Sequence, residues 1–414
     1  MILPEIYVKG GTIVVCEHEN TEVRDDVEAT CTTAGYTGDT YCLDCGKLLA
    51  EGEEIAALGH DMVWDGNVGE EGYHGVACSR CEATDLVECT MVNGTCSICG
   101  YTEAPVVPTD PALVFASKSL SLQSYIQFNF AARIKTVLNN YDSWYITVSR
   151  YDYMQGKTIE DTVEGAQYSS SLWIFPVNLY SYMLNDKVTV TLYGVKNGVT
   201  YQGETYTSSV ADYVNDKIAS QPEATKTMYA NMLEYGAKAQ IYMNYNPSSL
   251  ATDNLGEYAS YITTTLPAME DISSNTSTGA TGVTFSRWAL GISDSVKLQC
   301  AVRQGTVTNK NNVYAIVTWT RQGETVTQRI EGEDFVASGK LFVVVVDGIM
   351  AIEGRTPITV TIYDKTTNAA VSESMTSSIS SYVANSQSLA NAAQVNVLNA
   401  LLNYYDSATA VYGS

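Results

Sequence analysis

The chain contains the segment LYGVKNGVTYQGETYTSSVADYV at residues 192–214, and a divergent copy of it, IYDKTTNAAVSESMTSSISSYV, at residues 362–383. Within these segments Tyr213 corresponds to Tyr382. Upstream, Arg133 corresponds to Arg303 at almost the same separation along the chain. A near-constant offset over most of a module indicates an internal repeat. Residues 113–265 and 283–414 are therefore predicted to be two copies of one domain.

Each copy is predicted to begin with strands and to end with helices. Residues 119–134, SLSLQSYIQFNFAARI, and residues 295–304, SVKLQCAVRQ, alternate apolar side chains with polar or small ones, which is typical of half-buried antiparallel strands. Residues 208–220 and 226–245 carry apolar side chains at helical spacing, and Ser208 or Ser209 is a plausible N-cap. This order predicts an α+β fold in which an antiparallel sheet or sandwich carries a C-terminal helical hairpin.

Two segments are predicted to be linkers. Residues 101–112, YTEAPVVPTDPA, are rich in Pro, which ends helices and strands and stiffens a spacer. Residues 266–282, LPAMEDISSNTSTGATG, are rich in Ser, Thr and Gly, as a flexible connector would be. The remaining part, residues 1–100, is predicted to be a separate N-terminal module.

The charge and the hydropathy of the chain argue against two classes of partner. The 414 residues include 23 Lys and Arg against 46 Asp and Glu, a formal net charge of −23. Nucleic-acid binding needs an excess of positive charge to neutralise phosphates, so no nucleic-acid partner is expected. The longest apolar run, Leu341–Val346, is far shorter than the ~20 residues that span a bilayer, so no membrane insertion is expected.

The N-terminal module carries nine of the ten Cys and all three His of the chain within its first 99 residues. Three C-x-x-C pairs stand out: Cys42 with Cys45, Cys78 with Cys81, and Cys96 with Cys99. A C-x-x-C turn directs two thiolates at one point and so forms half of a tetrahedral zinc site. The other candidate ligands are Cys16, His18, Cys31, His60, His74 and Cys89. Twelve ligands would supply three four-coordinate structural zinc ions.

The spacing suggests how these ligands group. The first predicted site joins Cys42 and Cys45 to Cys16 and His18, with Cys31 or His60 as possible substitutes. The second joins His60 and His74 to Cys78 and Cys81. The third starts from Cys89, Cys96 and Cys99, with its fourth ligand left open. Disulfides are the alternative, since small extracellular domains often use them in place of a core. The odd number of Cys and the positions of the His favour metal.

The same segment resembles a known group of modules. CEHENTEV, EATCTTAGYTGDTYCLDCGKLLAEGEEI and AALGH resemble the short Cys/His repeats of large secreted surface proteins of gut Firmicutes, and VNGTCSICG resembles the terminal version of that unit. The similarity covers most of residues 15–101; the second unit lacks an equivalent of Cys31, and Cys89 stands where such repeats usually have His. MLEYGAKAQIYMNYN and ALLNYYDSATAVYG are similar to a helical segment that recurs in these proteins. The resemblance implies an extracellular location at a bacterial cell surface, in an anaerobic setting where thiolate–zinc sites persist.

Three functions remain open. The leading hypothesis is a non-catalytic surface module for adhesion to a host or dietary glycan or protein, because 29 Tyr and 5 Trp offer amphipathic contact area. The first alternative is a spacer or stalk without a ligand site. The second is a glycoside hydrolase, which needs two carboxylates across a cleft. Its candidates are Glu164, Glu331, Glu333 and Asp334. No catalytic residue or organic cofactor is predicted, because residues 100–414 contain no His and only Cys300, so a Ser-His-Asp triad or a Cys-His pair cannot form there.

Overall fold

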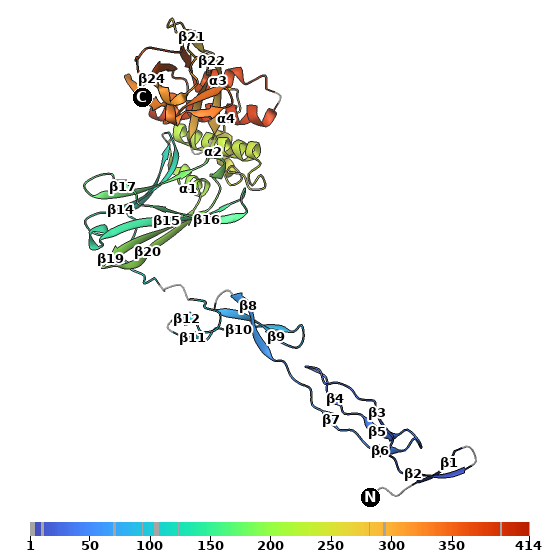
Figure 1. Ribbon diagram of the computed structural model, residues 1–414. Coiled ribbons are helices and arrows are strands. Elements are labelled where there is room, and N and C mark those ends of the chain that lie inside the picture. Colours follow the sequence, from blue (N-terminus) through green and yellow to red (C-terminus); the bar gives the residue numbers. More distant parts are fainter. Residues whose placement is uncertain are drawn as a thin grey trace. The chain divides into compact units, whose positions relative to one another are not determined.

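The computed structural model describes residues 5–9, 12–68, 72–92, 94–102, 107–122, 124–280, 282–292, 295–389 and 391–413 (Figure 1). The chain is mainly antiparallel β-sheet with few α-helices, and it ends in a long helix. It separates into two compact units, Met1–Val106 and Val107–Ser414. Both predicted strand-plus-helix regions lie in the second unit. None of the described helices combines the length and the hydropathy needed to span a bilayer.

The first unit consists of short antiparallel ribbons. Its sheets have the orders β1-β2, β3-β5-β6, β4-β7, β10-β9-β8 and β11-β12. The strands are β1 (Glu5–Lys9), β2 (Thr12–Cys16), β3 (Thr21–Arg24), β4 (Gly35–Tyr36), β5 (Asp39–Cys42), β6 (Leu48–Ala50), β7 (Glu54–Ile55), β8 (Met62–Val68), β9 (Tyr73–Cys78), β10 (Thr84–Glu88), β11 (Met91–Val92) and β12 (Thr95–Cys96).

In the described part of residues 16–102 there is almost no apolar core. In the described part of residues 16–102, Val76 is the only large aliphatic side chain that is buried. Six of the other buried side chains are cysteines, and Leu58, Leu86 and Ile98 are each at least half exposed. Folding of so small a unit without an aliphatic core needs another source of stability, such as a metal or a disulfide.

The second unit contains four sheets with the orders β13-β14-β18-β17, β16-β15-β19-β20, β22-β23-β27-β26 and β21-β29-β28-β24-β25. In the first half the strands are β13 (Ser117–Leu122), β14 (Ile126–Arg133), β15 (Ser143–Asp152), β16 (Lys157–Val163), β17 (Ala166–Gln167), β18 (Leu172–Leu179), β19 (Val188–Lys196) and β20 (Val199–Ser208). In the second half they are β21 (Ser274–Thr276), β22 (Thr284–Ile292), β23 (Val296–Arg303), β24 (Val313–Arg321), β25 (Glu324–Glu331), β26 (Val336–Ser338), β27 (Leu341–Val346), β28 (Ile358–Asp364) and β29 (Ser374–Ser377).

Helices follow the strands in each half. They are α1 (Val210–Lys217), α2 (Glu223–Met243), α3 (Ile379–Asn385) and α4 (Ala392–Tyr412). Ser209 caps α1, because its hydroxyl accepts from the Asp212 N–H at 3.0 Å while the Asp212 carboxylate accepts from the Ser209 N–H. The long helices α2 and α4 pack against each other (Figure 1). At this contact the Tyr235 and Tyr404 rings stack with centroids 6.2 Å apart.

Apolar faces of the sheets and helices meet in one continuous core. Phe128 and Phe175 come from one sheet of the first half, and Ile146 and Val190 come from the other. The Phe128 ring also meets Tyr213 of α1 edge-on, with centroids 5.4 Å apart. The core therefore binds the helices to the sheets.

Three details differ from the sequence-based expectations. The alternating segment 119–134 is a hairpin of β13 and β14 and not one strand; Leu122 lies directly opposite Ile126, so the turn preserves the phase of the alternation. Ile241, expected on the buried stripe of α2, is 44% exposed. Part of the expected connector 266–282 forms β21, which pairs with β29.

The Pro-rich linker is only partly described, because residues 103–106 lie outside the described residues. From Val107 onward the segment belongs to the second unit. The Asp110 N–H donates to the Gln202 carbonyl at 2.8 Å, and the Gln202 N–H donates to the Pro108 carbonyl at 2.9 Å. These bonds dock the segment on β20.

A buried carboxylate makes the stability of the second unit depend on pH. Asp186 is 5% exposed, and burial raises its pKa to about 6 although the Tyr245 hydroxyl donates to it at 2.5 Å. Its Oδ1 has no hydrogen-bond partner among the described residues. Because the folded-state pKa exceeds the unfolded value of 3.8, the native state holds the proton more tightly. The resulting stabilisation is complete below about pH 4 and is lost as the pH rises through about 6.

Substitution of this carboxylate should reveal the pH effect. Asp186→Asn keeps an oxygen that can accept from the Tyr245 hydroxyl, and it cannot ionise. Relative to the wild type, the free energy of unfolding of the variant should therefore increase by up to ~3 kcal/mol between pH 4 and pH 7. Urea unfolding of both proteins at several pH values measures this difference, and pH effects on the first unit cancel in the comparison. Parallel stability profiles for the two proteins would contradict the assignment.

Candidate metal centres and a candidate binding hollow

Three clusters of four Cys and His side chains lie in the first unit. The ligand atoms within each cluster are all within 4.8 Å of one another. Together the clusters use all twelve predicted ligands. They are Cys16, His18, Cys42 and Cys45; Cys31, His60, Cys78 and Cys81; and His74, Cys89, Cys96 and Cys99.

The same turn builds half of each cluster. The first Cys of each C-x-x-C pair donates its backbone N–H to the carbonyl five residues later: Cys42 to Lys47, Cys78 to Ala83 and Cys96 to Tyr101. Gly46 and Gly100 follow the first and third pairs at φ of 76° and 75°, a conformation that favours glycine. The turn thus places two sulfurs side by side beyond the end of a strand.

The first cluster has the predicted membership. Cys16 ends β2 and Cys42 ends β5, and their sulfurs are 3.4 Å apart. His18 adopts a φ of 58°, which is uncommon for a residue other than glycine, and its Nδ1 lies 3.5 Å from the Cys45 sulfur. Neither Cys31 nor His60 takes part in this cluster.

The second cluster differs from the predicted grouping by one residue, and the third contains the three predicted cysteines together with a fourth residue that the prediction left open. His74, expected with Cys78 and Cys81, lies in the third cluster, and Cys31 takes its place in the second. The reason is strand β9, which carries His74 and Cys78 four residues apart. At ~3.3 Å per residue the strand separates these positions by about 13 Å, too far to share one metal ion. The open fourth position of the third site is thereby filled by His74.

All three histidines face their clusters with the same ring nitrogen. His60 Nδ1 lies 3.3 Å from the Cys81 sulfur, and His74 Nδ1 lies 3.6 Å from the Cys89 sulfur. With His18, each cluster therefore offers one Nδ1 and three sulfurs.

The sulfur separations fit a shared metal better than a disulfide. Cys31 and Cys78 are 3.7 Å apart, as are Cys89 and Cys99, and every cysteine is a free thiol. A disulfide bond is about 2.05 Å long. Four ligands about 2.3 Å from a tetrahedral zinc ion place their sulfurs about 3.8 Å apart. Each cluster could therefore hold a metal ion.

The electrostatics of the clusters favour the same conclusion. Hydrogen bonding to His18 lowers the pKa of Cys42 to about 6, and the backbone N–H of Arg80 lowers that of Cys78 to about 5. Burial has the opposite effect on Cys31 and Cys89, raising their pKa values to about 11 and about 12. One thiolate forms readily in each site, but several buried thiolates need a cation to compensate their charge.

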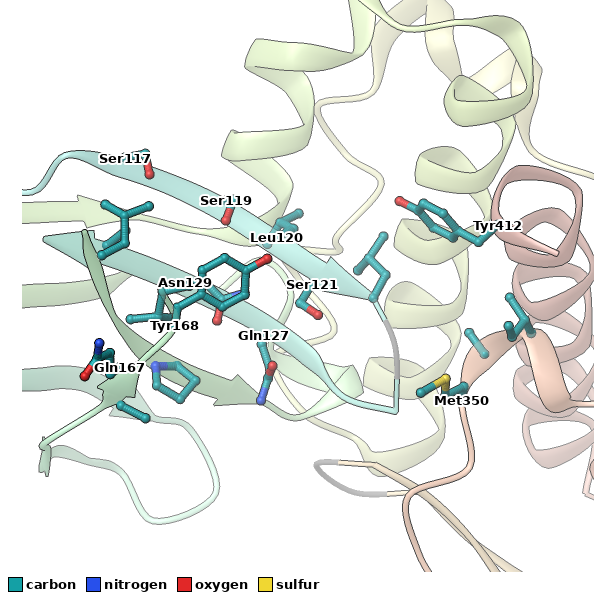
Figure 2. Close-up of a pocket in the computed structure, with 18 of the residues that line it drawn as sticks. Ser117, Ser119, Leu120, Ser121, Gln127, Asn129, Gln167, Tyr168, Met350 and Tyr412 are labelled. Atoms are coloured by element: carbon teal, nitrogen blue, oxygen red, sulfur yellow. The ribbon is translucent and has the colours of Figure 1, made fainter. Parts of the chain in front are cut away.

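A wide hollow in the second unit is a different kind of candidate site. It has a volume of about 960 Å³, at the upper end of the ~300–1,000 Å³ range of ligand pockets. Its floor is the solvent face of the β13-β14-β18-β17 sheet, with polar residues from β13 and β14 and the adjacent Tyr168. The facing wall includes Met350 and Tyr412 (Figure 2). Nothing in the sequence pattern singled out this surface.

The five tryptophans, which were counted with the tyrosines as contact area, do not form such a surface. Trp319 is buried, and Trp144 and Trp173 are half-buried and meet edge-on with centroids 5.4 Å apart. Trp288 is half-buried against Phe285. Trp64, 44% exposed, lies in the first unit.

Two of the four candidate carboxylates of a hydrolase, Glu331 and Glu333, are engaged in surface ion pairs. Glu331 contacts Arg329 at 2.6 Å and Lys365 at 2.9 Å, and Glu333 contacts Lys365 at 2.9 Å. Hydrogen bonding to Arg329 lowers the pKa of Glu331, whereas a general acid needs a raised pKa. Glu164 is exposed.

Comparison with known proteins adds no assignment to these sites. No protein-family model matches the chain, and no curated protein is significantly similar to it. The interpretation of the clusters and of the hollow therefore depends on their own chemistry.

Proposed function

We propose that this protein is a non-catalytic binding module of a bacterial cell surface, which attaches to a host or dietary glycan or protein and whose N-terminal unit is held together by structural zinc. The observation that carries the binding role is the hollow of the second unit, whose floor presents polar side chains from β13 and β14, since a spacer needs no such cavity. The extracellular bacterial location follows from the resemblance of residues 15–101 to surface-protein repeats.

Zinc is the metal that the donor sets favour. Three thiolates and one imidazole in a compact group suit a tetrahedral zinc ion. Four protein ligands leave no open coordination position for water or substrate, so the role is structural and not catalytic.

The second unit is proposed to be a duplicated domain. The sheet orders β13-β14-β18-β17 and β22-β23-β27-β26 run through the strands of the two halves in the same way. Two contacts also join positions that the repeat makes equivalent. Tyr235 stacks on its counterpart Tyr404, and Tyr125 forms a β-bridge with its counterpart Ser295. Contacts between equivalent positions are typical of packing about a pseudo-two-fold axis.

A non-catalytic role is favoured over hydrolysis. Glu331 and Glu333 are paired with Lys and Arg, and in the described part of the second unit the remaining Cys, Cys300, is buried. No observation favours the hydrolase over a binding module.

Binding assays with the full chain test this function. A glycan array and a pull-down from mucus should each be tried, and we expect saturable retention in at least one, without release of reducing sugar. A lack of binding in both assays would favour the spacer hypothesis. Sugar release that Glu331→Gln abolishes would support the hydrolase instead.

A further inference from the structure

We propose that the hollow over the β13-β14-β18-β17 sheet is the ligand site and that its ligand is an uncharged saccharide chain. This inference rests on the proposed binding function and specifies where and what the module binds.

The floor of the hollow presents polar groups that the protein leaves free. Ser119 lies directly opposite Asn129 across β13 and β14, and Ser121 lies opposite Gln127. The side chains of Ser119, Ser121 and Asn129 form no hydrogen bond within the described parts of the protein, whereas Gln127 donates to Asn178 at 2.7 Å. Figure 2 shows the labelled side chains along these two strands. Hydroxyl and amide groups both donate and accept, as is needed to bind sugar hydroxyls.

The spacing of these groups suits an extended ligand. The two cross-strand pairs are two residues apart along the strands, so they repeat at about 7 Å. A row of equivalent donors and acceptors can contact successive units of a polymer. On the neighbouring strand β18, Ile174 and Pro176 lie beside the polar row and supply apolar surface for the faces of sugar rings.

The charge of the lining selects an uncharged ligand. Among the described residues that line the hollow, Arg321 is the only charged one, and its guanidinium is occupied by Glu353 at 2.6 and 3.0 Å and by the Gly348 carbonyl at 2.8 Å. In this described lining an anionic ligand would meet no free cation, in a chain of net charge −23, and a cationic ligand would meet no carboxylate. A neutral ligand brings no charge that would stay unpaired in the hollow.

Two tyrosines offer stacking surfaces at the hollow. Tyr168 is 73% exposed and Tyr412 is 49% exposed, and both line it. An amphipathic partner that stacks on an exposed tyrosine ring removes the apolar face of the ring from water. The tyrosine hydroxyl can still form a hydrogen bond with a polar group.

The corresponding face of the second half lacks this pattern. At the offset that relates Arg133 to Arg303, Ala289 and Gly291 stand in place of Ser119 and Ser121, and the charged Lys297 in place of Gln127. Gln299 remains in place of Asn129 and lies opposite Ala289. The polar row is thus a property of the first half alone, and Gln299 provides a matched control.

Affinity electrophoresis of the full chain tests the proposal. The gels contain starch, galactomannan, xyloglucan or mixed-linkage β-glucan as neutral polymers, and polygalacturonate as an acidic one. We expect retardation in at least one neutral gel and none in polygalacturonate. Asn129→Ala and Tyr168→Ala should each weaken the apparent affinity at least tenfold. Gln299→Ala and Tyr153→Ala, at an exposed tyrosine in the turn between β15 and β16, should not change it. Thermal unfolding of all four variants verifies that they fold.

The possible outcomes distinguish failure of the proposed ligand site from failure of the proposed binding function. Retardation that Asn129→Ala and Tyr168→Ala leave intact would place the ligand elsewhere and overturn the site, while the binding function would stand. Preference for polygalacturonate would overturn the neutral ligand class. No retardation in any gel would overturn the saccharide ligand, and the mucus pull-down then decides whether the binding function itself survives.

Discussion

Removal of metal from the full chain should unfold the first unit and leave the second folded. The described part of residues 16–102 buries only one large aliphatic side chain, so the three clusters are its main source of order. Metal binding of this kind contributes on the order of 10 kcal/mol per structural zinc ion. The second unit has a continuous apolar core that uses none of the ligands. Its unfolding transition should therefore be insensitive to a chelator.

Thiol reactivity measures this difference directly. The protein as purified should contain about three zinc ions and few reactive thiols. After 1,10-phenanthroline, the nine cysteines of the clusters should react with a thiol reagent. Cys300 is fully buried, which raises its pKa, and it should react only after denaturation, as an internal control. Added zinc should reverse the change. Absence of zinc together with oxidised cysteines would contradict the metal assignment.

Paired substitutions should establish which ligands share a metal ion. Cys81→Ser is expected to remove the second ion and leave two. Adding Cys31→Ser should cause no further loss, because both residues belong to that cluster, whereas adding His74→Gln should remove a second ion and leave one. Metal analysis and the absorption of cobalt-substituted protein measure the stoichiometry. Cys300→Ser is the control and should retain three ions.

The opposite result has a definite meaning. If His74 shared a site with Cys78 and Cys81, as the sequence spacing suggested, the Cys81→Ser/His74→Gln variant would retain two ions. A loss of all metal in every double variant would show that the clusters fold only together.

The sequence identified the twelve residues of the clusters and the grouping of the first cluster, but not the full membership of the second and third. A C-x-x-C pair is local, so Cys42 and Cys45 or Cys96 and Cys99 had to meet whatever the rest of the chain did. The partner of each pair is set by strand pairing over longer distances. In YHGVAC (73–78) the alternate residues His74, Val76 and Cys78 are all buried on one face. This period of two indicates a strand, and in a strand His74 and Cys78 lie too far apart to share a metal ion.

The same limit applies to the second unit. The alternation of residues 119–134 indicated strand but did not reveal the turn, because a hairpin that pairs Leu122 with Ile126 leaves the alternation unchanged. The hollow was not predictable either. Ser119 and Asn129 occupy the polar positions that any half-exposed strand would fill, and only the packing of α2 against α4 brings Tyr412 and Met350 to face them.

The order of the ligands along the chain determines how the metal-bound unit responds to tension. Cys31 lies between the ligands of the first cluster, and His74 lies between those of the second. The three closed loops, 16–45, 31–81 and 74–99, therefore overlap and cover every residue from 16 to 99. A force that pulls on the two ends of this stretch would pass from one metal centre to the next through the segments that join them, such as residues 31–42 and 74–78. Full extension of the stretch would therefore require metal–ligand bonds to break.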